Sequence, residues 1–164
     1  MLLEARAENC FSSTHVLKIN GQAVGKFEGR FFSEGLDLAL TGMRRFKFEK
    51  PGVFAGTFQL KDAESDAVLA TAHPAGIFTS AWDMKLAGGD AQLCKAGWFK
   101  SAYELRDGDR VLATVDRLGM CERGWQVNAS ADLQAPDLLV VGLVYHIIRK
   151  RQDQQAAAAA SHGS

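Results

Sequence analysis

The sequence predicts a mainly β fold: a closed antiparallel barrel of about twelve strands around a central hydrophobic C-terminal helix. Two observations lead to this prediction. Before residue 130, short segments that alternate apolar and polar residues are separated by glycine-containing turns. After residue 135, the run PDLLVVGLVYHIIRKR has no polar face over most of its length. Alternation is typical of an antiparallel sheet with one buried face, and a helix that is apolar all round is buried in protein or in a membrane.

Length and composition are those of one globular domain. The 164 residues can bury a full hydrophobic core without a disulfide or metal. The 19 basic and 19 acidic residues give a formal net charge of +0, so the basic excess of nucleic-acid-binding proteins is missing. The three cysteines, Cys10, Cys94 and Cys121, are odd in number and widely spaced. This favours reduced, mostly buried thiols in a cytoplasmic protein over a disulfide framework or a zinc knuckle.

Turn dipeptides mark the predicted hairpins. Asn20-Gly21, Gly88-Gly89 and Asp107-Gly108 each tolerate the positive φ angles that tight hairpins need. In the last of these hairpins, alternate residues are apolar and are expected to face inward: Tyr103, Leu105, Val111, Ala113 and Val115. Leu112 is the one apolar residue among the polar residues that alternate with them. The segments around Phe78 to Leu86 and Trp125 to Ala129 alternate in the same way.

The hairpins are also repeated in sequence. FQLKDAESDAVLATA (58–72) resembles YELRDGDRVLATV (103–115), and HVLKINGQAVGKF (15–27) is a weaker third copy. Three units are too few for a propeller, so one closed meander fits better. The repeat predicts two equivalent hairpins in which Leu60 lies opposite Val68 and Leu105 lies opposite Val111, all four pointing inward.

The final apolar segment is expected to be a helix from residue 136 to about 151 that fills the barrel. Pro136 and Asp137 suit its first turn, and the basic residues 149–151 suit its end. The apolar run is about half of the ~20 residues that a membrane span needs, so no transmembrane span is predicted. The domain covers residues 1–152, and residues 153–164 form a low-complexity tail expected to be disordered, with room for one or two further helical turns before the chain frays. The residues assigned to the structural core of the helix are Leu139, Gly142, Leu143, His146 and Ile147, with Gly142 expected to admit a strand closely.

The repeated LKD…LAT and LRDGDRVLATVDR hairpins followed by PDLLVVGLVYHII resemble the tubby C-terminal-like superfamily. Within it the chain is most similar to the LURP-one-related proteins, with the phospholipid scramblases as more distant relatives. The resemblance covers residues 3 to 152 and implies a barrel of about twelve strands around a C-terminal helix. Tubby domains bind phosphoinositides, and scramblases act at membranes. No lipid-binding or calcium-binding motif of these families can be matched here residue by residue.

The densest basic stretch, MRRFKFEKPG (43–52), is the candidate binding surface. Its alternation points the basic side chains outward from one strand, as an anionic-lipid patch or as a solvated strand face. The candidate patch consists of Arg44, Arg45, Lys47 and Lys50, and its extent depends on whether it joins Lys26 or Arg30.

For the other candidate residues, the sequence favours a structural role over a functional one. His15, His73 and His146 are expected to be structural, and Asp107 with Asp109 to form a turn and not a calcium loop. The chain contains neither G-x-S-x-G nor H-E-x-x-H, and no phosphate-binding loop. No catalytic residue, cofactor or metal is therefore predicted.

The sequence thus favours a non-catalytic binding or scaffold domain that uses the barrel exterior. The alternative is a peripheral membrane protein that binds anionic lipid headgroups in the manner of a scramblase. An enzyme with an unrecognised site is the third possibility. The partner is either an unknown protein or an anionic membrane lipid, and no nucleic acid is expected.

Overall fold

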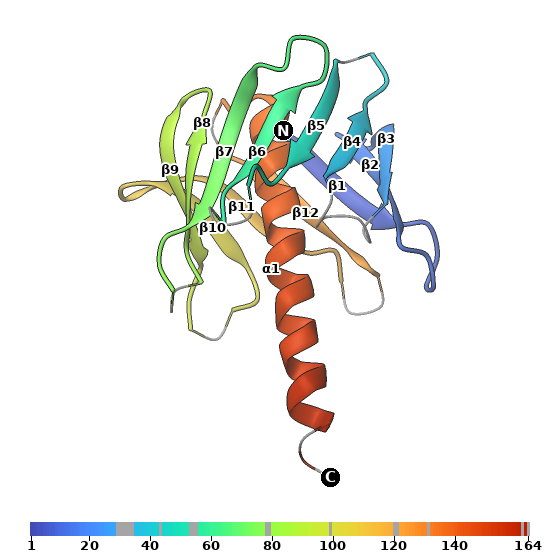
Figure 1. Cartoon of the computed structure of the whole chain (residues 1–164), viewed down its shortest axis with the longest axis vertical. Coiled ribbons are helices and arrows are strands. Elements are labelled where there is room, and N and C mark those ends of the chain that lie inside the picture. Colours follow the sequence, from blue (N-terminus) through green and yellow to red (C-terminus); the bar gives the residue numbers. More distant parts are fainter. Residues whose placement is uncertain are drawn as a thin grey trace.

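The computed structural model describes residues 1–28, 35–42, 44–52, 56–77, 80–98, 100–119, 122–130, 132–161 and 163. These residues form twelve strands and then one helix (Figure 1). The elements are β1 (Leu2–Ala7), β2 (Thr14–Ile19), β3 (Gln22–Glu28), β4 (Leu36–Ala39), β5 (Arg45–Glu49), β6 (Phe58–Asp62), β7 (Val68–Pro74), β8 (Trp82–Leu86), β9 (Gly89–Lys95), β10 (Tyr103–Asp107), β11 (Arg110–Arg117), β12 (Gly124–Ala129) and α1 (Ala135–Ser161).

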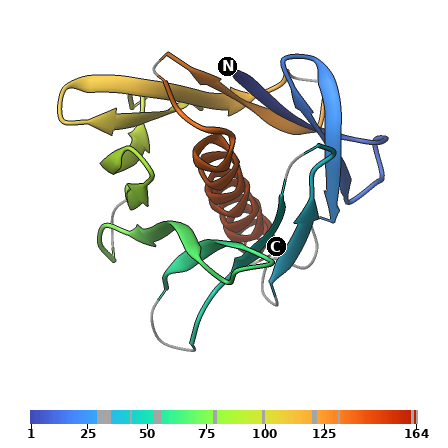
Figure 2. The ribbon, with the colours of Figure 1, turned by 90° about the horizontal axis from the view of Figure 1, so that it is seen from above.

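The strands form one antiparallel sheet that curls into a nearly closed barrel around α1 (Figure 2). The order is β3-β2-β1-β12-β11-β10-β9-β8-β7-β6-β5-β4, so the first and last strands of the sheet are β3 and β4. These two strands come together at a seam, where the Thr41 N–H donates a hydrogen bond to the Val24 carbonyl. The predicted fold class is confirmed.

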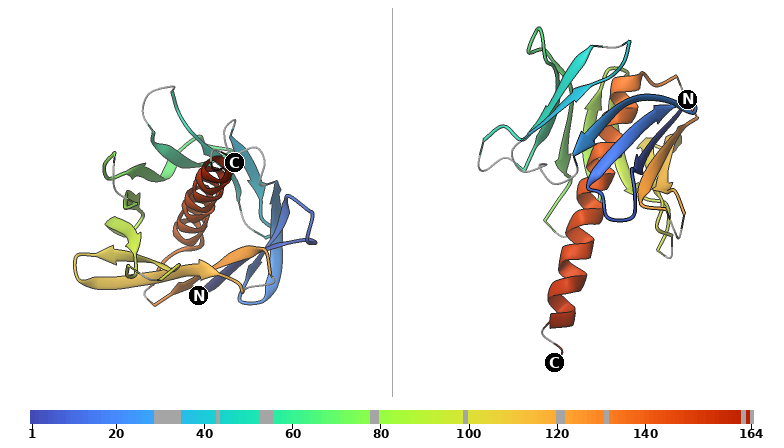
Figure 3. Two further views of the ribbon diagram at one scale, coloured as in Figure 1. Left: turned by 90° about the horizontal axis from the view of Figure 1, so that it is seen from below. Right: turned by 90° about the vertical axis from the view of Figure 1, so that its right-hand side faces the viewer.

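The barrel has two different ends. Because all neighbouring strands are antiparallel, the odd-numbered strands run one way and the even-numbered strands the other. α1 begins just after the end of β12 and runs back through the barrel, so it leaves beside the loops that follow odd-numbered strands (Figures 1 and 3). We call this the exit end; it includes the loops β1–β2, β7–β8, β9–β10 and β11–β12. The opposite end is the entry end.

α1 is the core of the barrel. Leu139 and Leu143 are almost completely buried, and Ile147 is 5% exposed, as predicted. The inward side chains of the strands complete the core around them. A helix with no polar face is stable here because the strands surround it on every side. Within the described part of the chain, no helix is both long and apolar enough to cross a membrane.

The start of α1 is fixed by a buried carboxylate. Asp137 Oδ1 accepts a hydrogen bond from the Ala87 N–H at 3.1 Å, and Oδ2 accepts one from the Gln134 N–H at 3.1 Å. The sequence suggested only a favourable interaction with the helix dipole. The structure adds a link between the helix and the β8–β9 turn.

α1 is longer than predicted. It continues to Ser161, so the tail is helical over residues 153–161, which is slightly more than the one or two further turns that were allowed for it. Alanine has the highest intrinsic helix propensity, and residues 156–160 are all alanine. The helix is already nucleated inside the barrel, so each further residue adds a hydrogen bond without a new nucleation cost.

The repeated hairpins share a β-bulge, so their strand register differs from the predicted one. Leu60 and Leu105 point inward as predicted, but they pair with Ala70 and Ala113, not with Val68 and Val111. Val68 pairs with Lys61 and is 49% exposed. The third copy has the same irregularity, with Leu17 opposite Gly25 and Lys18 opposite Ala23. Each hairpin therefore has one extra residue in its second strand, and these residues pack partly buried against the core: Val24, Leu69 and Leu112.

The expectation of buried cysteines also changes. Cys10 is exposed and Cys94 is half-buried, so neither thiol is core filler. Cys121 and the predicted strand positions Phe78 and Thr79 lie outside the described residues.

Candidate functional site

The predicted basic patch lies on and beside β5, and acidic neighbours neutralise much of it. Lys47 Nζ is 3.0 Å from Glu49 Oε2, and the Arg44 guanidinium is 3.6 Å from Asp62 Oδ2. Lys61 of β6 reaches the other Glu49 oxygen at 2.8 Å. Hydrogen bonds from Lys61 and Lys47 lower the pKa of the Glu49 carboxyl, so this negative charge persists at neutral pH.

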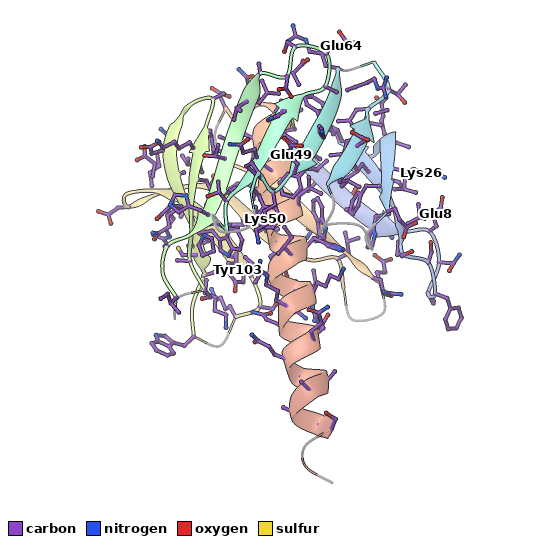
Figure 4. All side chains as sticks on the ribbon, viewed as in Figure 1. Glu8, Lys26, Glu49, Lys50, Glu64 and Tyr103 are labelled. Carbon is purple, nitrogen blue, oxygen red and sulfur yellow. The ribbon has the colours of Figure 1, made fainter. Side chains whose placement is uncertain are left out.

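The other two predicted patch residues, Arg45 and Lys50, lie at the start of β5 and just beyond its end. Arg45 and Lys50 are exposed, and Lys50 lies beyond Glu49 toward the exit end (Figure 4). Lys26 does not extend the patch, because it forms an ion pair with Glu8 (Figure 4). Arg30 lies outside the described residues. The four predicted residues therefore form a mixed-charge strand face.

Of the residues assigned to the helix core, Leu139, Gly142, Leu143 and Ile147 are buried, whereas His146 is half-buried. Gly142 and His146 contact side chains of the barrel wall. The Trp125 ring of β12 packs directly on Gly142, where an added Cβ would lie 2.0 Å from Trp125 Cζ3. Gly142 thus admits a strand side chain, as expected. His146 lies edge-on to the rings of His15 and Phe27, with centroid distances of 5.1 and 5.7 Å.

Below this contact, a cavity of about 630 Å³ opens at the exit end. We call it the exit cavity. It lies between the second half of α1, the start of β2 and the β11–β12 loop. Its lining residues are Ser13, His15, Arg117, Gly119, Glu122, Arg123, Gly124, Trp125, Tyr145, His146, Arg149, Lys150, Asp153, Gln154 and Ala157.

Four cations and two carboxylates line the exit cavity, a formal balance of +2 (four minus two) with neutral histidines. Both carboxylates are already engaged. Glu122 is 2.8 Å from Arg6, and Asp153 is 3.6 Å from Arg149. Arg117 and Arg123 form no ion pair with any described residue, although Arg123 donates a hydrogen bond to the Cys10 carbonyl at 2.8 Å. The cavity therefore favours a negatively charged occupant.

His15 forms part of the aromatic wall of the cavity. Its Nδ1 donates to the Ser13 carbonyl at 3.0 Å, and its ring stacks on Phe27 with a centroid distance of 4.9 Å. Burial lowers the pKa of His15, and the nearby Arg123 acts in the same direction. His15 is therefore neutral at physiological pH. It packs against Phe27, as a structural residue does, and it also lines the cavity.

Two buried polar atoms in residues of the cavity wall have no hydrogen-bond partner among the described residues. They are the indole Nε1 of Trp125 and the hydroxyl of Tyr145. Both residues are at least 98% buried. Burial raises the pKa of Tyr145, so its hydroxyl keeps its proton and can donate. Buried polar groups are nearly always paired, so two unpaired donors in the described core are unusual.

The exit end also carries exposed hydrophobic side chains on three separate loops. Phe11 (β1–β2), Ile77 (β7–β8) and Trp98 (β9–β10) are 97%, 94% and 96% exposed. Several exposed cations lie at the same end and form no ion pair with any described residue: Lys95, Lys100, Arg117, Arg123 and Arg151. The Arg151 guanidinium lies 5.5 Å from the centroid of the Trp82 ring.

Sequence reasoning missed the exit cavity because its parts lie far apart along the chain. The sequence indicated His146 only as a core residue and the basic run at 149–151 only as a helix end.

His73 lies away from this cavity, on β7, 3.7 Å from Asp83 of β8. In the described ranges, no group of three or more His, Cys, Asp or Glu side chains is placed to hold a metal ion.

Comparison with known proteins returns no matching family model, no matching curated protein and no matching solved structure.

Proposed function

We propose that this chain is a non-catalytic binding domain whose binding face is the exit end of its barrel, and that the surface it binds there is an anionic membrane. The observation that carries the proposal is the position of Phe11, Ile77 and Trp98, three nearly fully exposed hydrophobic side chains at one end of the molecule. Single exposed hydrophobic residues are common on soluble proteins. Three on separate loops at the same end of the barrel indicate an interaction surface.

The chemistry of the exit end favours a lipid surface over a purely apolar partner. Tryptophan prefers the interface between the headgroups and the hydrocarbon. Lysine and arginine side chains beside it contribute about 1 kcal/mol each near an anionic leaflet. Lys95 and Lys100 flank Trp98 in the sequence, so one loop combines both kinds of residue.

The projecting part of α1 is compatible with this orientation. Residues 152–161 extend about 15 Å beyond the barrel at 1.5 Å per residue (Figure 3). Their only charged residue is Asp153, which pairs with Arg149. The helix end can therefore enter the headgroup region beside the loops without burying an unpaired charge.

Vesicle co-sedimentation tests the proposal. The wild type is expected to bind phosphatidylcholine vesicles that contain ~30 mol% phosphatidylserine, because each cation contributes about 1 kcal/mol near such an anionic surface. It should not bind vesicles of pure phosphatidylcholine. Trp98→Ser combined with Ile77→Ser should abolish binding, because both side chains leave the apolar interface. Val68→Ser at the entry end is the matched control and should bind normally.

Charge variants locate the face independently. Lys95→Ser/Lys100→Ser and Arg45→Ser/Lys47→Ser each remove two positive charges, the first pair from the exit end and the second from β5. Only the first pair should weaken binding, and added salt should weaken the wild type in the same way. If β5 variants lose binding and exit-end variants retain it, the binding face is wrong. A wild type that ignores anionic vesicles at low salt would leave a protein partner as the occupant of the exit end.

A further inference from the structure

Two histidine rings meet inside the exit cavity. His15 comes from β2 and His146 from α1, and their ring centroids lie 5.1 Å apart with the ring planes nearly perpendicular. Both residues line the cavity, and the Phe27 ring of β3 packs against both of them. Histidine is the side chain that ordinarily changes its charge between pH ~5 and ~8. Proton uptake by this pair therefore adds positive charge at the end of the barrel where α1 emerges.

The pair lies among charged residues from several elements. Those that line the cavity or act on the charge of His15 are Arg117 of β11, Glu122 and Arg123 of the β11–β12 loop, Glu28 of β3, and Arg149, Lys150 and Asp153 of α1. β12 lines the cavity only with the uncharged Gly124 and Trp125. All three carboxylates are already engaged: Arg6 and Arg149 pair with Glu122 and Asp153, and Thr14 Oγ1 donates to Glu28. A proton on either ring is thus added to a positive environment.

The free protein resists this protonation. Burial has the largest effect on His15 and lowers its pKa, the Ser13 carbonyl and Glu28 act in the opposite direction, and Arg123 acts with burial. The ordinary histidine pKa of ~6.5 applies to the unfolded chain, so in acid the unfolded chain binds a proton before the folded chain does. The neutral form of His15 therefore contributes stability above pH ~6.5, and this contribution is lost as the pH falls through the folded pKa.

We infer that the His15–His146 pair makes attachment of the exit end to an anionic membrane proton-dependent, with tighter attachment in acid. This regulation rests on the membrane proposal above and concerns the same face. The potential of an anionic leaflet falls off over about 8 Å in physiological salt, so it acts on charges in a cavity that opens at the docking end without contact to either ring. A surface that binds the protonated protein more tightly must also favour its protonation.

His73 provides an internal comparison. It is half-buried on the outer face of β7, and its Nε2 lies 3.7 Å from Asp83 Oδ2. A proton on His73 is offset by this adjacent carboxylate, whereas the carboxylates around the exit-cavity pair are already engaged. The fourth histidine, His162, lies outside the described residues and stays unchanged in every variant.

Vesicle co-sedimentation at two pH values tests the coupling. The wild type, His15→Gln, His146→Gln, the double variant and His73→Gln are compared on the anionic vesicles described above at about pH 7.5 and about pH 5, on either side of the ordinary histidine pKa. In acid, the wild type and His73→Gln should bind more tightly than the double variant, by about fivefold for each proton taken up. Each single variant should keep part of this gain, and any effect of acid on the lipid is common to all of them.

The wild-type protein provides a second readout, which also covers failure of His15→Gln to fold after the loss of its ring from the stack on Phe27. The histidine ring C–H resonances are titrated by NMR in the free protein, with anionic bicelles and with neutral bicelles. Anionic bicelles should raise the titration midpoints of the exit-cavity histidines, and neutral bicelles should not. His146→Gln and His73→Gln assign the resonances.

The outcomes separate this regulation from the membrane proposal. An acid gain that the double variant loses, together with midpoints raised by anionic bicelles, supports the regulation. A wild type that gains no more in acid than the double variant, midpoints that anionic bicelles leave unmoved, or a gain that His73→Gln removes would overturn it and leave the membrane proposal in place. Absence of binding to anionic vesicles at both pH values would overturn the membrane proposal, and the regulation with it.

Discussion

At the scale of single residues, Gly142 shows how tightly the helix and the barrel wall fit together. The Trp125 ring occupies the space that any larger side chain at position 142 would need. In an exposed helix, alanine would be better than glycine by about 1 kcal/mol. Inside this barrel the preference is reversed, because the indole cannot move away without disturbing β12 and the exit cavity.

Gly142→Ala is therefore expected to destabilise the protein by about 1–3 kcal/mol, the usual cost of overpacking a core. Urea denaturation measures the change. In a Trp125→Leu background the same substitution should be neutral or stabilising, since the clash is gone. Equal effects in both backgrounds would show that the ring does not restrict position 142.

At the scale of secondary-structure elements, the three repeated hairpins share the position of their β-bulge but differ in the residue that follows it. Ala70 and Ala113 occupy the position after the bulge in two copies, and Gly25 occupies it in the third. The third copy borders the seam, where β4 runs directly past it. A Cβ on Gly25 would lie 2.8 Å from the Ala39 carbonyl oxygen and 2.7 Å from Leu40 Cδ2. The seam thus explains why this copy lacks the methyl group.

Gly25→Ala should lower the free energy of unfolding by about 1–3 kcal/mol, because the backbone of β4 has to shift. Hydrogen exchange should become faster in β3 and β4 before the rest of the sheet. Gly88→Ala is the control, since an added Cβ there meets no atom within 4 Å. If Gly25→Ala is as well tolerated as Gly88→Ala, the seam is looser than its contacts indicate.

At the scale of the whole molecule, the barrel depends on its helix and the helix on its barrel. Side chains of α1 from residue 138 to 148 fill the lumen, and the inward faces of the strands have no other partner in the described core. The consequence for function is that ligands are excluded from the centre of the barrel. Binding is left to the outside and to the exit end, where the helix emerges.

Leu143→Ala is expected to destabilise the whole fold by about 2–5 kcal/mol through the cavity it leaves. A single cooperative urea transition with a lower midpoint should report the loss. Gln155→Ala, in the projecting part of the same helix, should leave the midpoint unchanged. Wild-type stability in Leu143→Ala would mean that α1 is not the core of the barrel.

The sequence by itself determined the fold class, the central helix and its buried residues. These features are encoded locally, because a period of two marks a half-buried strand and an uninterrupted apolar run marks an enclosed helix. Even the exception at Leu112 carried information, since it marks the bulge that shifts the pairing by one residue. The helix propensity of the alanine run at 156–160 also accounts for the continuation of the helix into the tail.

Only the tertiary structure decided the charges of the β5 face and the existence of the exit cavity. The positive charges of Lys47 and Arg44 are neutralised by ion pairs with Glu49 and Asp62, and Asp62 belongs to the neighbouring strand β6. The cavity joins β2, the β11–β12 loop and α1, segments that are more than 100 residues apart at the extremes. Such contacts depend on strand order and register over the whole sheet, which no local pattern of residues specifies.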